Sequence, residues 1–267
     1  MKHIKLPELL CPAGSMEALA AAVDGGADAV YFGGNHFNAR MFANNFDPAA
    51  MREAVSLCHT YGVKAYLTLN TLPLDREIKT FLDAAYDAAQ AGIDALIVAD
   101  LGGAAAIRRT IPTLELHAST QASGHNADAG RMLAELGFSR MVLAREVSLT
   151  DIRTYIENSP IEAEVFVHGA LCMSVSGQCY FSAMLGSRSG NRGACAQTCR
   201  LPFSVNSQKG GYALSLKDNS LIPHLADMQA IGVASAKIEG RMKRPEYVAA
   251  AVRACVEQRD FGFITDQ

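Results

Sequence analysis

No stretch of this sequence approaches the roughly 18 consecutive apolar residues that a membrane-spanning helix requires. Residues 1–7 also lack the apolar core of a signal peptide. Tryptophan is absent. A net charge of −3 and a pI near 6.2 give no general attraction to nucleic acid, so RNA binding would need a local basic patch. We therefore expect a cytoplasmic protein that does not associate with a membrane.

Two patterns typical of hydrolases are missing as well. The sequence has no Gly-x-Ser-x-Gly elbow and no His-Glu-x-x-His helix, which would supply a serine nucleophile or a zinc site. Their absence argues against serine peptidases and zinc peptidases of these types.

A glycine followed by a short apolar run recurs along the chain. The glycines that begin these runs are Gly26, Gly62, Gly92, Gly137 and Gly232. Glycine suits the C-terminal cap of a helix, and a short apolar run is typical of a strand buried on both faces. The remaining predicted strands are 7–12, 114–119 and 162–168. The pattern therefore predicts eight strands.

Amphipathic segments lie between these strands, for example 49–61, 78–91 and 126–136. Alternating strands and helices favour a parallel sheet, and eight such units fit an α/β fold of the TIM-type (β/α)8 barrel kind in one domain, 1–267. A doubly wound open sheet is the alternative. The chain is either complete at this size or part of a longer protein with a C-terminal domain.

Cysteine is used sparingly except in one segment. The predicted seventh and eighth strands are separated by a cysteine-rich insertion, 170–218, which we expect at the C-terminal mouth of the barrel. It contains Cys172, Cys179, Cys195 and Cys199 among glycine and small polar residues. This C-x6-C-x15-C-x3-C spacing favours an iron–sulfur cluster, with zinc or no metal as alternatives. The other three cysteines, Cys11, Cys58 and Cys255, are predicted to pack in the core.

Four longer stretches carry a family resemblance: Glu8–Gly14, Glu164–Cys179, Asn191–Arg200 and Lys237–Lys243. They resemble the collagenase-like peptidase U32 family over nearly the whole chain. The resemblance implies a barrel-like fold. It also implies an oxygen-labile 4Fe–4S cluster on four cysteines and oxygen-independent hydroxylation of a tRNA or rRNA base or of a ubiquinone precursor. Prephenate is implicated as hydroxyl donor in some members.

One segment departs from the family pattern. Some relatives place a cluster cysteine in a Lys-Asp-Leu-Cys sequence, whereas residues 217–220 here read Lys-Asp-Asn-Ser. Serine is a poor iron ligand, so we expect the four metal ligands to be Cys172, Cys179, Cys195 and Cys199.

Polar residues near the ends of the predicted strands, together with Arg192 of the insertion, are the candidate site residues. The predicted catalytic residues are His168, Glu239 and Arg241. The predicted substrate-binding residues are His117, Gln121, Arg145, Arg192 and Lys237. Arginine binds carboxylates in a bidentate manner, as an anion such as prephenate would require. For each of these residues, a structural hydrogen bond or ion pair is the alternative interpretation.

The sequence thus predicts an enzyme that hydroxylates an RNA base or a small aromatic substrate without molecular oxygen. Such a reaction needs an electron-transfer partner, which the sequence does not identify. Two alternatives remain. A U32-type peptidase could use Cys172 or Cys179 with His168 as base, although four clustered thiols fit ligation better. A non-catalytic, cluster-bearing subunit could instead bind RNA or a protein partner.

Overall fold

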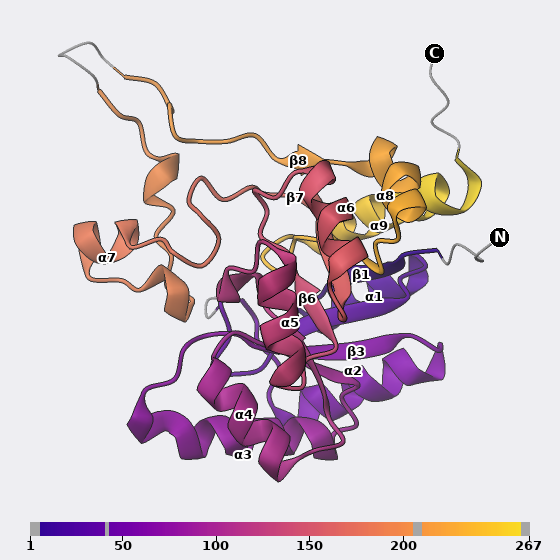
Figure 1. Ribbon diagram of the computed structural model, residues 1–267, viewed down its shortest axis with the longest axis vertical. Helices are drawn as coiled ribbons and strands as arrows, with labels where there is room; N and C mark the ends of the chain where they lie inside the picture. Colours follow the sequence, from indigo (N-terminus) through magenta and orange to yellow (C-terminus); the bar gives the residue numbers. More distant parts are fainter. Residues whose placement is uncertain (1–5, 41–42, 205–209, 263–267) are drawn as a thin grey trace.

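The computed structural model describes residues 6–40, 43–204 and 210–262, and these form a barrel surrounded by helices (Figure 1). The barrel strands are β1 (Glu8–Pro12), β2 (Ala29–Gly33), β3 (Lys64–Leu69), β4 (Ala95–Val98), β5 (Glu115–Ala118), β6 (Arg140–Val142), β7 (Glu162–Gly169) and β9 (Ser235–Ile238). All neighbours are parallel, and the ring closes because β9 pairs with both β7 and β1. The predicted (β/α)8 barrel is therefore confirmed, and the open sheet is excluded.

Helices follow the strands on the outside of this ring, and one further helix, α7, lies in the segment between β7 and β9. The helices are α1 (Met16–Asp24), α2 (Pro48–Thr60), α3 (Ile78–Gln90), α4 (Leu101–Thr110), α5 (Ala127–Glu135), α6 (Leu149–Asn158), α7 (Phe181–Gly186), α8 (Leu225–Ile231) and α9 (Pro245–Phe261). Oxygen-bearing side chains cap several of them, as Ser15 does for α1 and Asp100 for α4. The five predicted cap glycines all have positive φ, from 71° at Gly62 to 95° at Gly26. No helix among the described residues is both long enough and apolar enough to cross a membrane.

The main apolar core lies between the strands and the helices. It includes Cys11, Cys58 and Cys255, which are fully buried as predicted. A smaller apolar cluster, with Tyr31 and Tyr66 as its largest members, fills the barrel interior.

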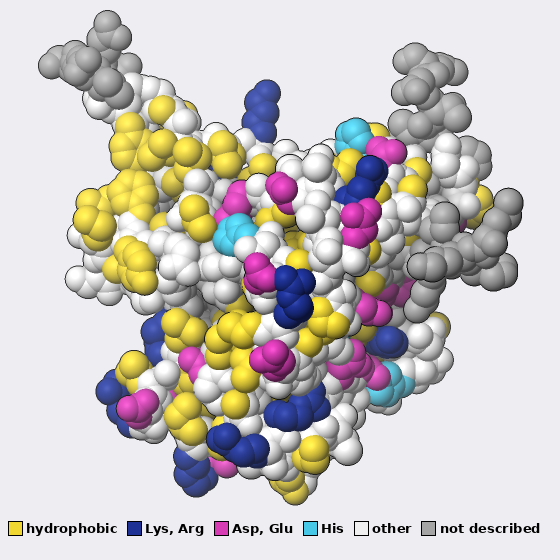
Figure 2. Space-filling model, in the orientation of Figure 1, with side chains coloured by type: hydrophobic (Ala, Val, Ile, Leu, Met, Phe, Trp, Pro, Cys, Tyr) yellow, Lys and Arg dark blue, Asp and Glu magenta, His cyan; other side chains and the backbone are white. Residues whose placement is uncertain are grey.

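Residues 170–218 lie between β7 and β9 in sequence and contain α7 and two 3-10 turns. They lead into β8 (Asn219–Ser220), a two-residue strand that runs antiparallel to β7. Figure 1 shows this segment, in orange, projecting from one side of the barrel. Figure 2 shows hydrophobic side chains on the same part of the surface. The most exposed large ones are Met184 (82%), Tyr212 (66%), Leu185 (63%) and Tyr180 (62%).

Candidate active site at the barrel mouth

A cavity opens at the C-terminal ends of the barrel strands, where the sequence predicted the site. It is lined by Tyr31, Ala39, Arg40, Thr68, Asn70, Ile97, Ser119, Thr120, Gln121, Val142, Arg145, Phe166, Lys237, Glu239 and Arg241. The cavity volume is about 50 Å³, which holds a few water molecules. Five of the eight predicted site residues line it: Gln121, Arg145, Lys237, Glu239 and Arg241.

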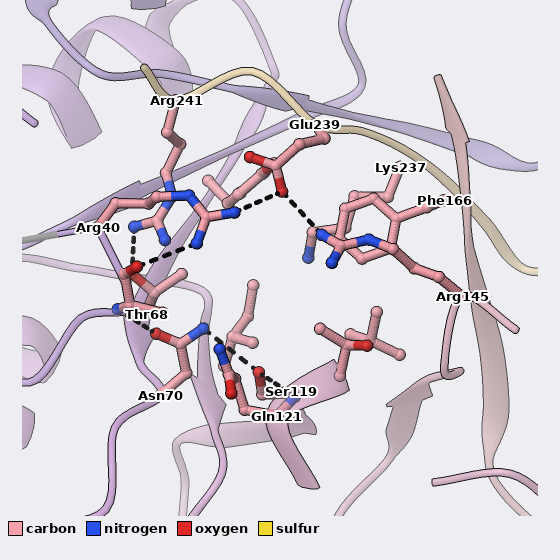
Figure 3. Close-up of a pocket in the computed structure, with 15 residues that line it drawn as sticks. Arg40, Thr68, Asn70, Ser119, Gln121, Arg145, Phe166, Lys237, Glu239 and Arg241 are labelled. Carbon is pink, nitrogen blue, oxygen red and sulfur yellow. Dashed lines mark hydrogen bonds and ion pairs between the residues drawn. The ribbon is translucent and has the colours of Figure 1, made fainter. Parts of the chain in front are cut away.

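Glu239 links two arginines across the mouth of this cavity. Its Oε2 atom lies 2.9 Å from Nη2 of Arg145 and 3.3 Å from Nη2 of Arg40 (Figure 3). The Arg145 guanidinium also lies over the Phe166 ring, 4.2 Å from its centroid. A carboxylate and an aromatic face thus hold Arg145 in one orientation.

The protonation state of Glu239 follows from its neighbours. Burial raises the pKa of this carboxyl, but Arg40, Arg145, Arg241 and Lys237 lower it more, and the net pKa is about 2. Glu239 is therefore an anion at every physiological pH. Burial and the nearby Arg40 lower the pKa of Arg241 to about 10, so this residue still carries its charge at neutral pH.

Arg241 is fixed by two contacts on the opposite wall. Its Nη1 donates to Thr68 Oγ1 at 2.9 Å, and that hydroxyl donates to the Phe32 carbonyl at 3.1 Å. The main chain of Arg241 also meets the loop after β1, where a Cβ at Gly14 would lie 1.9 Å from the Arg241 carbonyl oxygen. Only glycine allows this approach.

The lower wall in Figure 3 consists of neutral polar groups. Asn70 Nδ2 donates to Ser119 Oγ at 3.3 Å, and the same oxygen accepts from the Gln121 amide at 3.1 Å. Two buried atoms of cavity residues, Thr120 Oγ1 and Arg145 Nε, have no hydrogen-bond partner among the described residues. Buried polar atoms are usually satisfied, so these two are available to a ligand.

Below the cavity, the barrel interior contains a buried charge layer. Lys237 Nζ lies 2.6 Å from Glu164 Oε1, and Arg140 Nη1 lies 3.3 Å from Glu164 Oε2. Arg140 also pairs with Glu8 at 2.6 Å and with Glu162 at 2.7 Å. Burial raises the pKa of Glu164, but the two cations outweigh it and the net pKa is lowered. The layer joins β6, β7, β9 and β1, which are consecutive strands of the ring.

Three predicted site residues lie outside the cavity. Arg192 bonds to the loop after β3, with Nη1 on the Leu72 carbonyl at 2.5 Å and Nη2 on Glu77 at 2.9 Å. His117 is 1% exposed and stacks edge-on against Tyr66 inside the barrel.

His168 is turned outward by an irregularity in β7. Phe166 pairs with Lys237 but His168 pairs with Ile238, so one extra residue shifts the register. Paired residues face the same side of a sheet, and Ile238 lies in the outer core. The His168 ring accordingly stacks on Tyr247 of α9, at a centroid distance of 5.8 Å. Burial lowers the pKa of His168.

Arg40 and Phe166 are cavity residues that the sequence analysis did not identify. Arg40 lies seven residues after the end of β2. A prediction based on polar residues close to the strand ends therefore does not include Arg40. Phe166 could have been found by alternation, because Glu164, two residues earlier on the same strand, also faces the barrel interior.

The four cysteines of segment 170–218 lie in one neighbourhood. A Cβ at Gly190 would lie 3.7 Å from Cys195 Cβ and 3.9 Å from the Cys179 carbonyl. Burial raises the pKa of the Cys199 thiol, and the sulfurs of Cys172 and Cys195 add to the rise. All four thiols are free, and Cys195 Sγ accepts a hydrogen bond from the Gln197 amide at 3.4 Å.

Four free thiols with an amide N–H directed at sulfur are the donor set of an iron–sulfur cluster. In the described part of the chain, however, no three His, Cys, Asp or Glu side chains come close enough together to hold a metal ion. The thiols thus fit such a cluster by type and by neighbourhood, and the side chains would have to turn toward one another to bind it.

Comparison with known proteins identifies the family. Residues 14–262 match the family described as peptidase family U32. The chain belongs to this family. A solved U32 peptidase structure, Mk0906, shares the fold with a TM-score of 0.60 at 13% identity, covering 87% of this chain and 92% of that one.

Three curated U32 relatives cover most of the chain. A 23S rRNA 5-hydroxycytidine synthase of Escherichia coli is 42% identical over 90% of this chain and 37% of its own length. A tRNA hydroxylation protein of Bacillus subtilis is 40% identical over 93% and 62%. A collagenase of Porphyromonas gingivalis is 39% identical over 94% and 64%. The chain therefore spans between about a third and two thirds of the length of these relatives.

Proposed function

We propose that this chain is the barrel of an RNA hydroxylase, which adds a hydroxyl group to an RNA base without molecular oxygen and uses a 4Fe–4S cluster. Two relatives at 40% identity or more are named for hydroxylation of tRNA or for synthesis of hydroxycytidine in rRNA. Cys172, Cys179, Cys195 and Cys199 would hold the cluster. When bound, it would supply electron transfer or a Lewis acid to the hydroxyl donor.

The observation that carries this proposal is the position of the thiols relative to the cavity. The amide N–H of the cavity residue Arg145 donates to Ser176 Oγ at 3.2 Å, and a Cβ at Gly177 would lie 2.4 Å from the carbonyl oxygen of the cavity residue Gln121. Ser176 and Gly177 lie between Cys172 and Cys179 in the sequence. The cysteine segment therefore borders the cavity, so a cluster on these thiols would border the ligand site.

The charges of the cavity favour an anionic hydroxyl donor. Lys237 is paired with Glu164. Among the described lining residues, three guanidinium groups then face one carboxylate, Glu239, and the remaining charge is +2. Arginine recognises carboxylates through paired hydrogen bonds. A dicarboxylate such as prephenate would balance this charge.

The described side chains have separate tasks in this scheme. Arg40, Arg145 and Arg241 would bind the carboxylates, and Glu239 would keep the first two oriented before the ligand arrives. The unpaired Nε of Arg145 and Oγ1 of Thr120 would donate to the same ligand. The amide groups of Asn70 and Gln121 would donate to and accept from polar atoms of the base.

Peptidase activity has less support from the site. One relative is named a collagenase, but a peptidase needs a nucleophile beside its base. The Ser119 hydroxyl accepts from Asn70 and from the Gln121 amide, and Thr68 bonds to Arg241. No histidine is among the described residues that line the cavity.

The test of the cluster is its loss from a single variant. Wild-type protein purified without oxygen should contain about four iron and four sulfide per chain and should bleach in air. Cys179→Ala should lose most of this iron and its visible absorbance. Nucleoside mass spectrometry on RNA from cells with and without the gene should show the hydroxylated base only where wild-type protein is present.

Ser174→Ala is the matched control, because it changes a neighbouring small residue in the same segment without removing a thiol. Its iron content should equal that of the wild type. Wild-type iron in Cys179→Ala, or zinc in the wild type, would contradict the four-cysteine cluster.

A further inference from the structure

Lys237 lies at the bottom of the cavity in surroundings that are unusual for a lysine. Its side chain is 4% exposed. The Nζ atom lies 4.3 Å from the centroid of the Tyr31 ring and 5.6 Å from that of Phe166. It lies 2.6 Å from Glu164 Oε1. The amine thus lies between two rings and a carboxylate, on a residue that lines the cavity.

Glu164 does not need Lys237 as an ion-pair partner. Glu164 already pairs with Arg140 at 3.3 Å, and a second buried cation costs desolvation free energy. Burial lowers the pKa of Lys237 and Arg241 acts in the same direction, against the opposing effect of Glu164. A lysine that releases its proton more readily than usual is a nucleophile toward carbonyl carbon.

The residues around the amine indicate the chemical class of the carbonyl compound. Arg145 and Arg241 line the same cavity as Lys237. A ligand whose carboxylate is bound by these guanidinium groups would present an adjacent ketone to the amine of Lys237, which is drawn beside Phe166 and Arg145 in Figure 3. We propose that Lys237 forms a Schiff base with a 2-oxo acid bound in this cavity.

The step balances without an oxidant or a reductant. The Lys237 ammonium first passes one proton to Glu164. The resulting neutral amine attacks the ketone carbon, a C–N bond forms, and the π electrons of the carbonyl move to its oxygen. That oxygen leaves as water as the C=N bond forms, and both protons of this water come from the amine nitrogen. Glu164 accepts the hydrogen bond from the amine and is placed to relay these protons.

This inference goes beyond the proposed function and rests on it only in one respect. Prephenate is itself a 2-oxo acid, so a Schiff base would anchor the proposed hydroxyl donor. The chemistry at Lys237 requires neither the cluster nor RNA, and it can be measured with a simple 2-oxo acid.

The test is reductive trapping with pyruvate. Protein incubated with pyruvate and sodium borohydride should gain a carboxyethyl group, and peptide mapping should place it on Lys237. The Lys237→Arg variant keeps the charge beside Glu164 and should lose the label. Lys243→Arg, six residues further on at an exposed lysine, should be labelled as the wild type is. Acetone lacks the carboxylate and should label Lys237 about tenfold less.

Label spread over surface lysines of the wild type, or no label at all, would overturn the proposal. Because the map of wild-type peptides decides this, a failure of Lys237→Arg to fold does not affect the result. Cys179→Ala should still be labelled. Labelling of Lys237 without RNA hydroxylation would support the Schiff base and contradict the proposed function. RNA hydroxylation without labelling of Lys237 would support the proposed function and contradict the Schiff base.

Discussion

At the scale of single residues, the site depends on one buried carboxylate among several cations. Glu239 contacts Arg40 and Arg145 directly, and both it and Arg145 are only 12% exposed in their side chains. Removing one partner of a buried ion pair leaves an uncompensated charge in a poorly solvated place. Glu239 therefore stabilises the empty cavity as well as orienting its arginines.

Glu239→Gln should lower the free energy of unfolding by about 3 kcal/mol. The folded pKa of about 2 lies below the value of 4.5 for an unperturbed glutamate. The stabilisation by Glu239 is therefore fully present above about pH 4.5 and is lost as the pH falls toward 2. Urea unfolding of wild type and variant should give the same difference at pH 5 and at pH 8.

Glu135→Gln, on the exposed side of α5, is the control and should change stability by less than about 0.5 kcal/mol. If the difference in the free energy of unfolding between wild type and Glu239→Gln became smaller between pH 8 and pH 5, the Glu239 carboxyl would titrate in that range. That result would contradict the ion pairs of Glu239 with Arg40 and Arg145.

Strand-end polarity predicted several of the cavity residues, because parallel strands in a barrel end at the same rim. The same rule failed to place His168 inside, since a register irregularity in β7 cannot be seen in the sequence. Arg192 of the cysteine-rich insertion was predicted to bind an anionic ligand, whereas it reaches a neighbouring loop. Long side chains on loops find partners that depend on the folded path of the chain.

At the scale of elements, side-chain hydrogen bonds attach segment 170–218 to the barrel at Ser176 and at Arg192, among other contacts. Ser176 is buried and donates through its amide and its hydroxyl to Glu146, at 2.9 and 2.8 Å. Arg192 holds the other side through Leu72 and Glu77. The two attachments come from loops after different strands, so Cys179, which lies between them in the sequence, is held close to the barrel.

Arg192→Ala should loosen this segment without unfolding the barrel. The Arg192 ion pair is partly exposed, and such pairs contribute at most about 1 kcal/mol, or roughly a fivefold change in local opening. Hydrogen exchange of residues 188–200 should speed up by up to about this factor, while β1 to β6 should exchange as before.

Glu77→Gln removes the other partner and should give a similar effect, and the double variant should add little to either single change. Fully additive effects would show that the two side chains act independently.

At the scale of the whole molecule, the fold could be predicted well because its signals are local and repeated. Each unit contains a helix, a glycine and an apolar strand, and the hydrophobic pattern determines the register of the sheet. The closure of the ring was harder to predict from the sequence, because it depends on contacts between segments that are distant in the chain, such as β1 and β9. The close approach of Gly14 to the main chain of Arg241 is one such contact. The sequence indicates it only by having a glycine at this position.

Gly14→Ala should therefore weaken the closure of the barrel. The added methyl group would lie 1.9 Å from the Arg241 carbonyl, which is main chain and cannot rotate away. We expect a loss of about 3 kcal/mol or a fall in Tm of roughly 5–10 °C, measured by thermal unfolding.

Gly186→Ala is the matched control, since nothing lies within 4 Å of a Cβ at this position in α7. Its Tm should equal or slightly exceed that of the wild type. An equal Tm for both variants would mean that the loops after β1 and β9 can separate without cost.

Strand β9 lies between β7 and β1 in the ring, and this has a consequence for the order of events during translation. Ile238 follows Cys199 by 39 residues. At about 5–20 residues per second, the ribosome needs roughly 2–8 s to add them. During this interval all four clustered cysteines have been synthesised, while Lys237, Glu239 and Arg241 have not. Each nascent chain thus has its four clustered thiols before its barrel can close, and the thiols are open to oxidants and to metal donors first.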